Sequence, residues 1–237
     1  IYLFLMPLFF VCSGYFFKEI ADKASLLTFC RKRIKGLYLP YLKWSLLFLL
    51  LHNVFRHFHI TGSKIYHTQD YIRQVIRLVT MTDYELLIRP FWFIKELLFA
   101  SVIVASISII RARLFPNIGT FTLLFFSLTI AILSKYIPLI PLIGDCYLLF
   151  LSIAYFYSGI LIRKYKPSIP FTTPMIIISF FVVLIGSILF KRTIDMRFIT
   201  AKNMLPYYLI SLSGVIMVFC ISKKLECFSF KSALYYI

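Results

Sequence analysis

Long uncharged runs alternate with short basic stretches along the whole chain. Seven apolar segments can be drawn, at about residues 1–17, 38–55, 91–110, 117–134, 143–162, 171–190 and 204–221. Each approaches the roughly 20 residues that a helix needs to cross a bilayer. The runs are continuous rather than alternating, and lipid leaves no backbone group unbonded, so they predict helices rather than barrel strands. The pattern therefore predicts an all-α, polytopic transmembrane helix bundle that forms one membrane domain over residues 1–237.

The composition agrees with a membrane protein. Hydrophobic residues make up 61% of the 237 residues, and the mean hydropathy is +0.88, which is far more apolar than a soluble domain. The net charge of +17 would also suit nucleic-acid binding. However, the basic residues fall in short connections between apolar segments, where topology and lipid headgroups explain them. We therefore expect membrane lipids, and no nucleic acid, as partners.

Lysine and arginine are unevenly divided between the two sets of connections. More of them lie on the side that includes residues 18–37, and the excess grows when the long 56–90 connection is discounted. We therefore expect residues 18–37 in the cytoplasm and residues 56–90 outside. The chain begins inside one apolar run and stops on the approach to another, so we also expect further membrane helices beyond both ends.

Both of these connections are predicted to contain a short helix. In residues 18–37 we expect an amphipathic surface helix whose apolar residues dip into the interface, namely Leu26, Leu27, Phe29 and Ile34. The stretch "DYIRQVIRLVTM" predicts a second helix, lying over the outer mouth of the bundle. Its shared apolar face would consist of Tyr71, Val75, Leu78 and Val79.

Charged residues inside an apolar segment are the first candidates for chemistry. Lys95 and Glu96 follow Trp92 at the start of the 91–110 segment. One explanation is a lysine that snorkels to the interface with Glu96 beside it. Neighbours on a helix point about 100° apart, however, so each side chain needs its own partner. Intramembrane ionisable residues usually face the bundle interior or a wet cavity, and we therefore favour a functional site here.

Other polar residues join this candidate site. His52, at the outer end of the 38–55 segment, is either a general base or an interfacial residue. Arg89 shares a face with Trp92 at the outer headgroup level, and Trp92 suits an interface anchor equally well. Ser13, within "MPLFFVCSGYFF", is a candidate for substrate binding together with Arg89. The competing explanation for Ser13-Gly14 is a close approach of two helices.

Basic residues gather at the predicted cytoplasmic face. Arg31, Arg33 and Lys43 are candidates for binding a phosphate-bearing cofactor, and lipid headgroups are the alternative ligand. No C-x-x-C spacing occurs among the five cysteines, and no ligand cluster accompanies the histidines. No metal site is therefore expected.

Several stretches in order resemble the acyltransferase-3 family of integral membrane O-acyltransferases, most closely its fucose 4-O-acetylase-like branch. The stretches are "MPLFFVCSGYFF", "FCRKRIKGLYLPYL", "FWFIKELLF", "YFYSGILIRKY" and "YYLISLSGVIMVFCISKKL". Lys95 and Glu96 stand where the family signature has Arg and Asp, so the signs of the charges are kept. Leu5 stands where one branch of the family carries a histidine immediately before the Met-Pro.

The resemblance implies a specific chemistry. It implies about ten helices in the full protein, a catalytic histidine on a first helix that precedes this sequence, and a location in the bacterial inner membrane. The donor would be acetyl-CoA or another acyl-CoA from the cytoplasm, and the acceptor a carbohydrate of the cell envelope. Lys95 would then stabilise an oxyanion and Glu96 would hold a partner. The alternative function is a transporter or flippase for lipid-linked sugars, although no inverted repeat of charged residues supports it.

Overall fold

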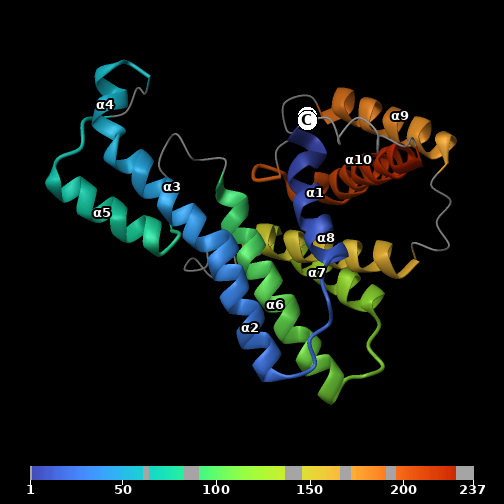
Figure 1. Cartoon of the computed structure of the whole chain (residues 1–237). Coiled ribbons are helices and arrows are strands. Elements are labelled where there is room, and N and C mark those ends of the chain that lie inside the picture. The colour runs from blue at the N-terminus through green and yellow to red at the C-terminus, as the bar shows by residue number, and fades with distance from the viewer. Residues whose placement is uncertain are drawn as a thin grey trace, which may run out of the picture. The chain divides into compact units, whose positions relative to one another are not determined.

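The computed structural model describes residues 2–60, 64–82, 91–136, 146–165, 172–190 and 196–227. These residues form helices and turns, with no strand among them, which confirms the all-α prediction (Figure 1). The chain divides into two compact units that interleave in sequence. The first unit contains Ile1–Lys18 and Phe115–Ile237, and the second contains Glu19–Leu114.

Three helices are long and apolar enough to cross a membrane, at Trp92–Leu114, Cys146–Tyr165 and Ala201–Leu225. Three shorter apolar helices accompany them, at Leu3–Tyr15, Thr120–Tyr136 and Thr173–Leu189. Six of the seven predicted segments therefore coincide with an apolar helix. The protein is a polytopic helical membrane protein.

The first unit is built around one buried helix. Its elements are α1 (Tyr2–Tyr15), α7 (Thr120–Tyr136), α8 (Cys146–Tyr165), α9 (Thr173–Phe190) and α10 (Ala201–Cys227). Helix α8 packs against both α7 and α1, and α10 packs against α1, α7 and α9. The middle of α8, from Leu151 to Gly159, is buried at every position. An apolar helix that is covered all round belongs to the core of a bundle.

Two glycines let α1 and α8 approach until their backbones touch. A Cβ atom on Gly14 would lie 1.9 Å from the carbonyl oxygen of Phe156, and one on Gly159 would lie 2.0 Å from that of Val11. Only glycine therefore fits at either position. This confirms close helix approach as a role of the Ser13-Gly14 pair, and it is the typical use of small residues between membrane helices.

Reciprocal hydroxyl pairs join α8 to α10. Tyr155 of α8 bonds Ser211 of α10, and Ser158 of α8 bonds Tyr208 of α10. The rings of Tyr155 and Tyr208 lie 4.8 Å apart between their centroids. Each helix thus contributes one tyrosine and one serine, three residues apart. The buried hydroxyls find partners in protein, where lipid would offer none.

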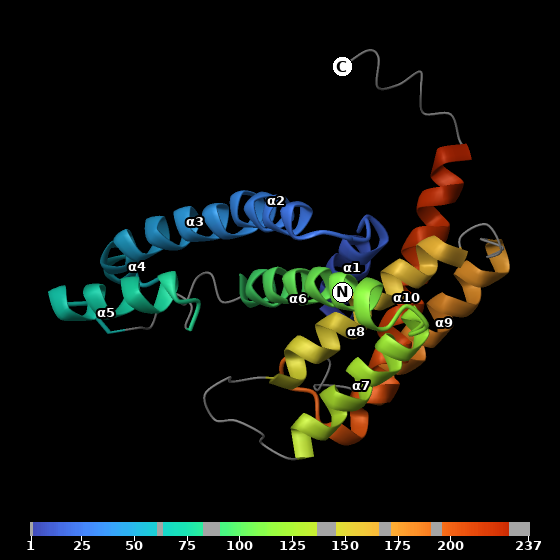
Figure 2. The same cartoon turned by 90° about the horizontal axis from the view of Figure 1, so that it is seen from below.

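The second unit contains one long helical rod with two helices along one side of it. The rod consists of α2 (Lys23–Arg33), the π-helical turn η1 (Ile34–Tyr38) and α3 (Leu39–Leu50), and α4 (His52–His57) follows it. Helix α5 (Thr68–Val79) packs against α3, and α6 (Trp92–Leu114) packs against α2 and η1. Figure 2 shows α5 and α6 on the same side of the rod.

The π turn has a local cause in Pro40. Proline has no N–H to donate, and its ring clashes with the carbonyl group four residues earlier in an α-helix. Directly before Pro40, the N–H of Leu39 bonds the carbonyl oxygen of Ile34, five residues back. The wider turn therefore lets the rod continue through a proline.

Polar ties join helix ends that the topology prediction places on one side of the membrane. Arg163, near the end of α8, donates to the carbonyl oxygen of Phe17, just after α1. Lys224, near the end of α10, donates to Thr173 at the start of α9. In the second unit, Arg111 pairs with Glu19 at 2.6 Å. These three ties agree with the predicted sides of the helix ends. The alternation of the remaining helices and the assignment of one side to the cytoplasm stay predictions.

Three predicted segments differ from the structure in detail. The 38–55 segment is not one helix, because α3 ends at Leu50 and α4 begins at His52. Helix α2 forms within residues 18–37, but it is not amphipathic, because its charged and apolar side chains are mixed around the axis. Helix α5 forms as predicted, yet its expected face is divided. Tyr71 and Leu78 pack inward, whereas Val75 and Val79 are exposed.

Replacement of Gly159 by alanine should destabilise the first unit. The added Cβ would meet backbone atoms of Val11 and Tyr15, which cannot rotate away. Overpacking of a core costs about 1–3 kcal/mol, so thermal unfolding in detergent should begin several degrees lower. The control is Gly119→Ala, whose Cβ would have only the Thr122 hydroxyl as a neighbour, at 3.9 Å. Equal melting temperatures of the two variants would contradict the close crossing.

Candidate active site

The start of α6 carries the predicted charged pair. Trp92 and Glu96 lie four residues apart on the buried stripe of α6, and they are only 6% and 7% exposed. Both side chains make interactions within the protein. Lys95 lies about 100° away around the helix and is half-buried. Its ammonium group makes no ion pair within the described residues.

Burial distinguishes the two charges. Glu96 is placed among protein atoms, which is what an acidic residue in an apolar helix requires. Lys95 keeps partial exposure and a long flexible stem, so its ammonium can move toward a ligand. The sequence predicted that the two side chains point apart. Which of the two is buried depends on the neighbours of α6.

Those neighbours can be placed from two contacts at opposite ends of α6. Phe91, directly before α6, packs against Leu49 of α3 and Leu78 of α5, while Arg111 pairs with Glu19 before α2. Helix α6 therefore runs antiparallel to the rod. Glu96 lies about 7.5 Å along α6 from Phe91, at 1.5 Å per residue.

Two buried polar residues of α3 were not predicted from the sequence. Tyr41 and Ser45 share one face of α3 with Leu49, at spacings of four residues, and both are buried. They lie one element away from the main contacts of α6, which packs against η1 and α2. The Oγ of Ser45 has no hydrogen-bond partner in the described part of the chain. The signal in the sequence that could have identified them is their spacing of four residues within an apolar segment, which places two polar side chains on one helix face.

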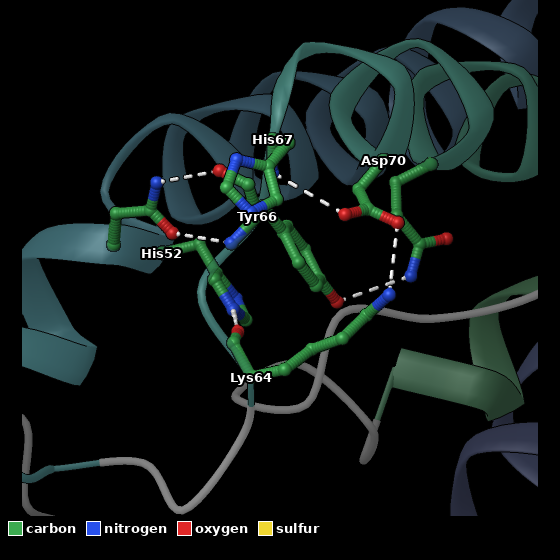
Figure 3. A network of polar contacts seen from close by, with 7 residues as sticks. His52, Lys64, Tyr66, His67 and Asp70 are labelled. Atoms are coloured by element: carbon green, nitrogen blue, oxygen red, sulfur yellow. Dashed lines mark hydrogen bonds and ion pairs between the residues drawn. The ribbon is translucent and has the colours of Figure 1, made fainter.

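His52 is held by a network at the far end of the rod (Figure 3). It is 1% exposed, and its ring stacks on that of Tyr66 with the centroids 3.6 Å apart. Its Nε2 lies 3.1 Å from the carbonyl oxygen of Lys64, so Nε2 carries the hydrogen, because a carbonyl only accepts. Asn53 clamps Tyr66 with two hydrogen bonds to its main chain. These contacts favour a positioning role for His52, and its assignment as a general base stays a prediction.

An ion pair completes this network. Lys64 donates to Asp70 at 2.9 Å, and Asp70 also accepts from the main-chain N–H of His67 at the start of α5. The hydrogen bond from Lys64 is the largest cause that lowers the pKa of the Asp70 carboxyl, followed by that from His67. This lowered pKa stabilises the folded protein at pH values above the pKa that Asp70 has in the unfolded chain. The stabilisation is lost as the pH falls through the lower pKa of Asp70 in the folded protein.

The three predicted donor-binding cations do not form one cluster. Arg31 and Lys43 are exposed. They lie twelve residues apart along the rod, which is about 18 Å. Arg33 is half-buried, with its guanidinium 5.1 Å from the centroid of the Phe29 ring, and burial lowers its pKa without removing its charge. Arg31 and Lys43 can therefore contact separate parts of a long polyanion, while Arg33 also serves packing.

The two predicted substrate-binding residues are placed differently. Ser13 is half-buried in α1, beside the close crossing at Gly14, and its hydroxyl makes no hydrogen bond within the described residues. It lies in the first unit, whereas the other described candidates lie in the second. Arg89 lies outside the described residues. No group of three metal-ligating side chains occurs in the described ranges, and Cys12, Cys30, Cys146 and Cys220 are free.

The fold and the site define a helical membrane protein with ionisable residues at the start of a spanning helix. A family model described as an acyltransferase domain, that of the acyltransferase-3 family, matches residues 1–237. The chain belongs to this family and is a membrane acyltransferase, which confirms the resemblance at the level of the family. The fucose 4-O-acetylase-like branch stays a prediction. No curated protein and no solved structure matches the chain.

Two substitutions of His52 distinguish a structural role of this residue from a role as general base. His52→Phe keeps the stack on Tyr66 and loses the hydrogen bond to the carbonyl oxygen of Lys64, worth about 1 kcal/mol. His52→Ala loses the stack as well, which adds about 0.5–1.5 kcal/mol. We expect unfolding in detergent to occur at the lowest temperature in His52→Ala, and acyl transfer to follow the folded fraction. A general base would instead show as transfer abolished in both variants while His52→Phe remains folded.

Proposed function

We propose that the protein transfers an acetyl group from acetyl-CoA to a hydroxyl group of a cell-surface or exported carbohydrate, in the bacterial inner membrane. The observation that supports this best is the start of α6, where Glu96 is buried and Lys95 keeps access to a ligand. A membrane acyltransferase needs polar groups at the depth where a donor from one side meets an acceptor from the other. The first turn of a spanning helix provides such a position.

The transfer requires three events at one carbonyl carbon. A base removes the proton of the acceptor hydroxyl, and the oxygen attacks the thioester carbon. The carbonyl oxygen becomes negative, and the ammonium of Lys95 stabilises it. The carbon–sulfur bond then breaks, and the released CoA thiolate takes up a proton, so that an ester and free CoA remain. Glu96 orients a hydroxyl or a cationic group beside the reaction.

The donor carries its phosphates at the end remote from the thioester. Arg31 and Lys43, on the exposed surface of the rod, offer charge to these phosphates at two separate points. Helix α3, which carries Lys43, directly follows η1, and η1 packs against α6. A donor held along the rod would thus bring its thioester toward the start of α6. This path connects the donor-binding cations of the rod with the charged pair of α6.

The first test is a direct assay on the purified protein in detergent or nanodiscs. Acetyl-CoA and a polysaccharide or lipid-linked sugar are supplied, and free CoA thiol and carbohydrate-bound acetyl groups are measured together. The proposal expects equal amounts of both products. Movement of the sugar across liposomes without release of CoA would instead support a flippase.

Lys95→Met should reduce acetyl transfer by about 100- to 1000-fold, as expected for loss of one oxyanion contact. Lys95→Arg should be milder because it keeps the charge. Glu96→Gln should also impair transfer, since it keeps the shape and removes the charge. The matched control is Lys202→Met, an exposed lysine in the first unit. Near-normal rates in both Lys95→Met and Glu96→Gln, at equal protein levels, would exclude the pair from the reaction.

Replacement of Arg31 and Lys43 together by alanine should raise the KM for acetyl-CoA and leave kcat unchanged. An exposed ion pair contributes up to about 1 kcal/mol, so two lost pairs predict a rise of roughly 5- to 30-fold at low salt. High salt should shrink the difference from the wild type. Lys32→Ala, which removes a neighbouring exposed lysine, is the control. An unchanged KM would assign these cations to lipid headgroups.

A further inference from the structure

Helix α5 carries a polar face that the proposed reaction does not use. Asp70, Arg73, Gln74 and Arg77 follow the spacing i, i+3, i+4 and i+7, so they share one side of the helix. Both arginines are exposed, and Gln74 is half-buried. The face is therefore polar along about 10 Å of the helix, and its positive charges outnumber its carboxylate.

The segment before α5 brings two more polar groups to this face. The ammonium of Lys64 lies 2.9 Å from the carboxylate of Asp70, and Gln74 donates to the hydroxyl of Tyr66 at 3.2 Å (Figure 3). Tyr66 is held in turn by its stack on His52. The cluster is thus fixed before a ligand arrives, which lowers the entropic cost of binding.

The cluster retains hydrogen-bonding groups of both kinds. Within the described residues, the Lys64 ammonium bonds only Asp70, and the Gln74 carboxamide bonds only Tyr66. The other N–H groups of the ammonium and the carbonyl oxygen of Gln74 are therefore open to a ligand. Arg73 makes no polar contact in the same part of the chain. Donors and an acceptor side by side suit a sugar hydroxyl, which both donates and accepts a hydrogen bond.

The charge of the face indicates which class of carbohydrate fits it. Asp70 balances Lys64, so the arginines of α5 provide excess positive charge. A guanidinium binds a carboxylate through two parallel hydrogen bonds. A lipid phosphate would meet the same arginines, but the Asp70 carboxylate would repel it, and the Gln74 carbonyl oxygen would find no donor on it. A sugar hydroxyl can donate to both of these groups.

We propose that this face of α5, together with Lys64, binds an acidic carbohydrate through its hydroxyl and carboxylate groups. The inference rests on the proposed function, because it identifies this ligand as the acceptor of the acetyl group. Residues 56–90, which include α5, are predicted to lie outside the cytoplasm, where an exported carbohydrate arrives. Arg73 selects for the acid group, and Gln74 and Asp70 bond the neighbouring hydroxyls.

The test measures carbohydrate binding by the purified protein without acetyl-CoA, so it does not depend on acetyl transfer. The probes are a fluorescent hexamer of galacturonate and its methyl ester, which differ only in charge, and the acid should bind several-fold more tightly. Arg73→Gln should weaken binding of the acid by about 5-fold, as for one exposed ion pair, and leave the ester unchanged. Gln74→Ala should weaken binding of both probes by about 2- to 10-fold. The matched control is Lys23→Gln, which removes an exposed cation at the start of α2.

Three results of this binding experiment would overturn the proposal. The galacturonate hexamer could fail to bind, the two probes could bind equally, or binding of the acid could be unchanged in both Arg73→Gln and Gln74→Ala. The measurement is repeated in nanodiscs of phosphatidylcholine with and without phosphatidylglycerol, where equal affinities are expected. Loss of binding in phosphatidylglycerol would assign the cations to lipid headgroups instead.

A transfer assay distinguishes failure of this inference from failure of the proposed function. If the acceptor site is correct, Arg73→Gln and Gln74→Ala raise the KM for the carbohydrate and leave the KM for acetyl-CoA unchanged. Binding that follows the predictions without any release of CoA would refute the proposed function and leave the carbohydrate site standing. Acetyl transfer with an unchanged KM for the carbohydrate in both variants would refute this inference alone.

Discussion

Polar side chains on the apolar helices of this protein need partners inside the protein, because lipid offers none. The structure meets this requirement in several ways. Ser152 and Ser158 bond carbonyl oxygens of their own helix, four residues back. Tyr155 and Tyr208 reach across to serines of the opposite helix. The second solution fixes the distance and the relative rotation of α8 and α10, and the apolar residues fill the arrangement that these pairs determine.

The crossing of α1 and α8 applies the same logic to the main chain. Because Gly14 and Gly159 have no side chains, each helix presents bare backbone to the other. The gain there is close packing, which substitutes for a hydrophobic driving force that is weak between helices in lipid. Helix α8 is buried on every side in its middle as a result, and α7 and α10 can pack around a fixed centre.

Much of the fold could be predicted from the sequence, because long apolar runs in lipid allow little besides helices. The break at Leu51 could not, since neither glycine nor proline marks it. Likewise, the Ser13-Gly14 pair indicated a close contact, but nothing in the sequence connected it to Gly159, far along the chain. At the candidate site, helical geometry predicted that Lys95 and Glu96 diverge. The burial of Glu96 depends on the register between α6 and the rod, which arises only when the helices pack.

The π turn before Pro40 sets the rotational phase of everything that follows it in the rod. A π turn holds one residue more than the corresponding α-helical turn, and one residue corresponds to about 100° of rotation. With a regular helix in its place, the faces of α3 would be turned by that angle relative to α2. Tyr41 and Ser45 would then leave the buried side of the rod and point along its flank. A local accommodation of one proline thus decides which side chains of α3 belong to the interior.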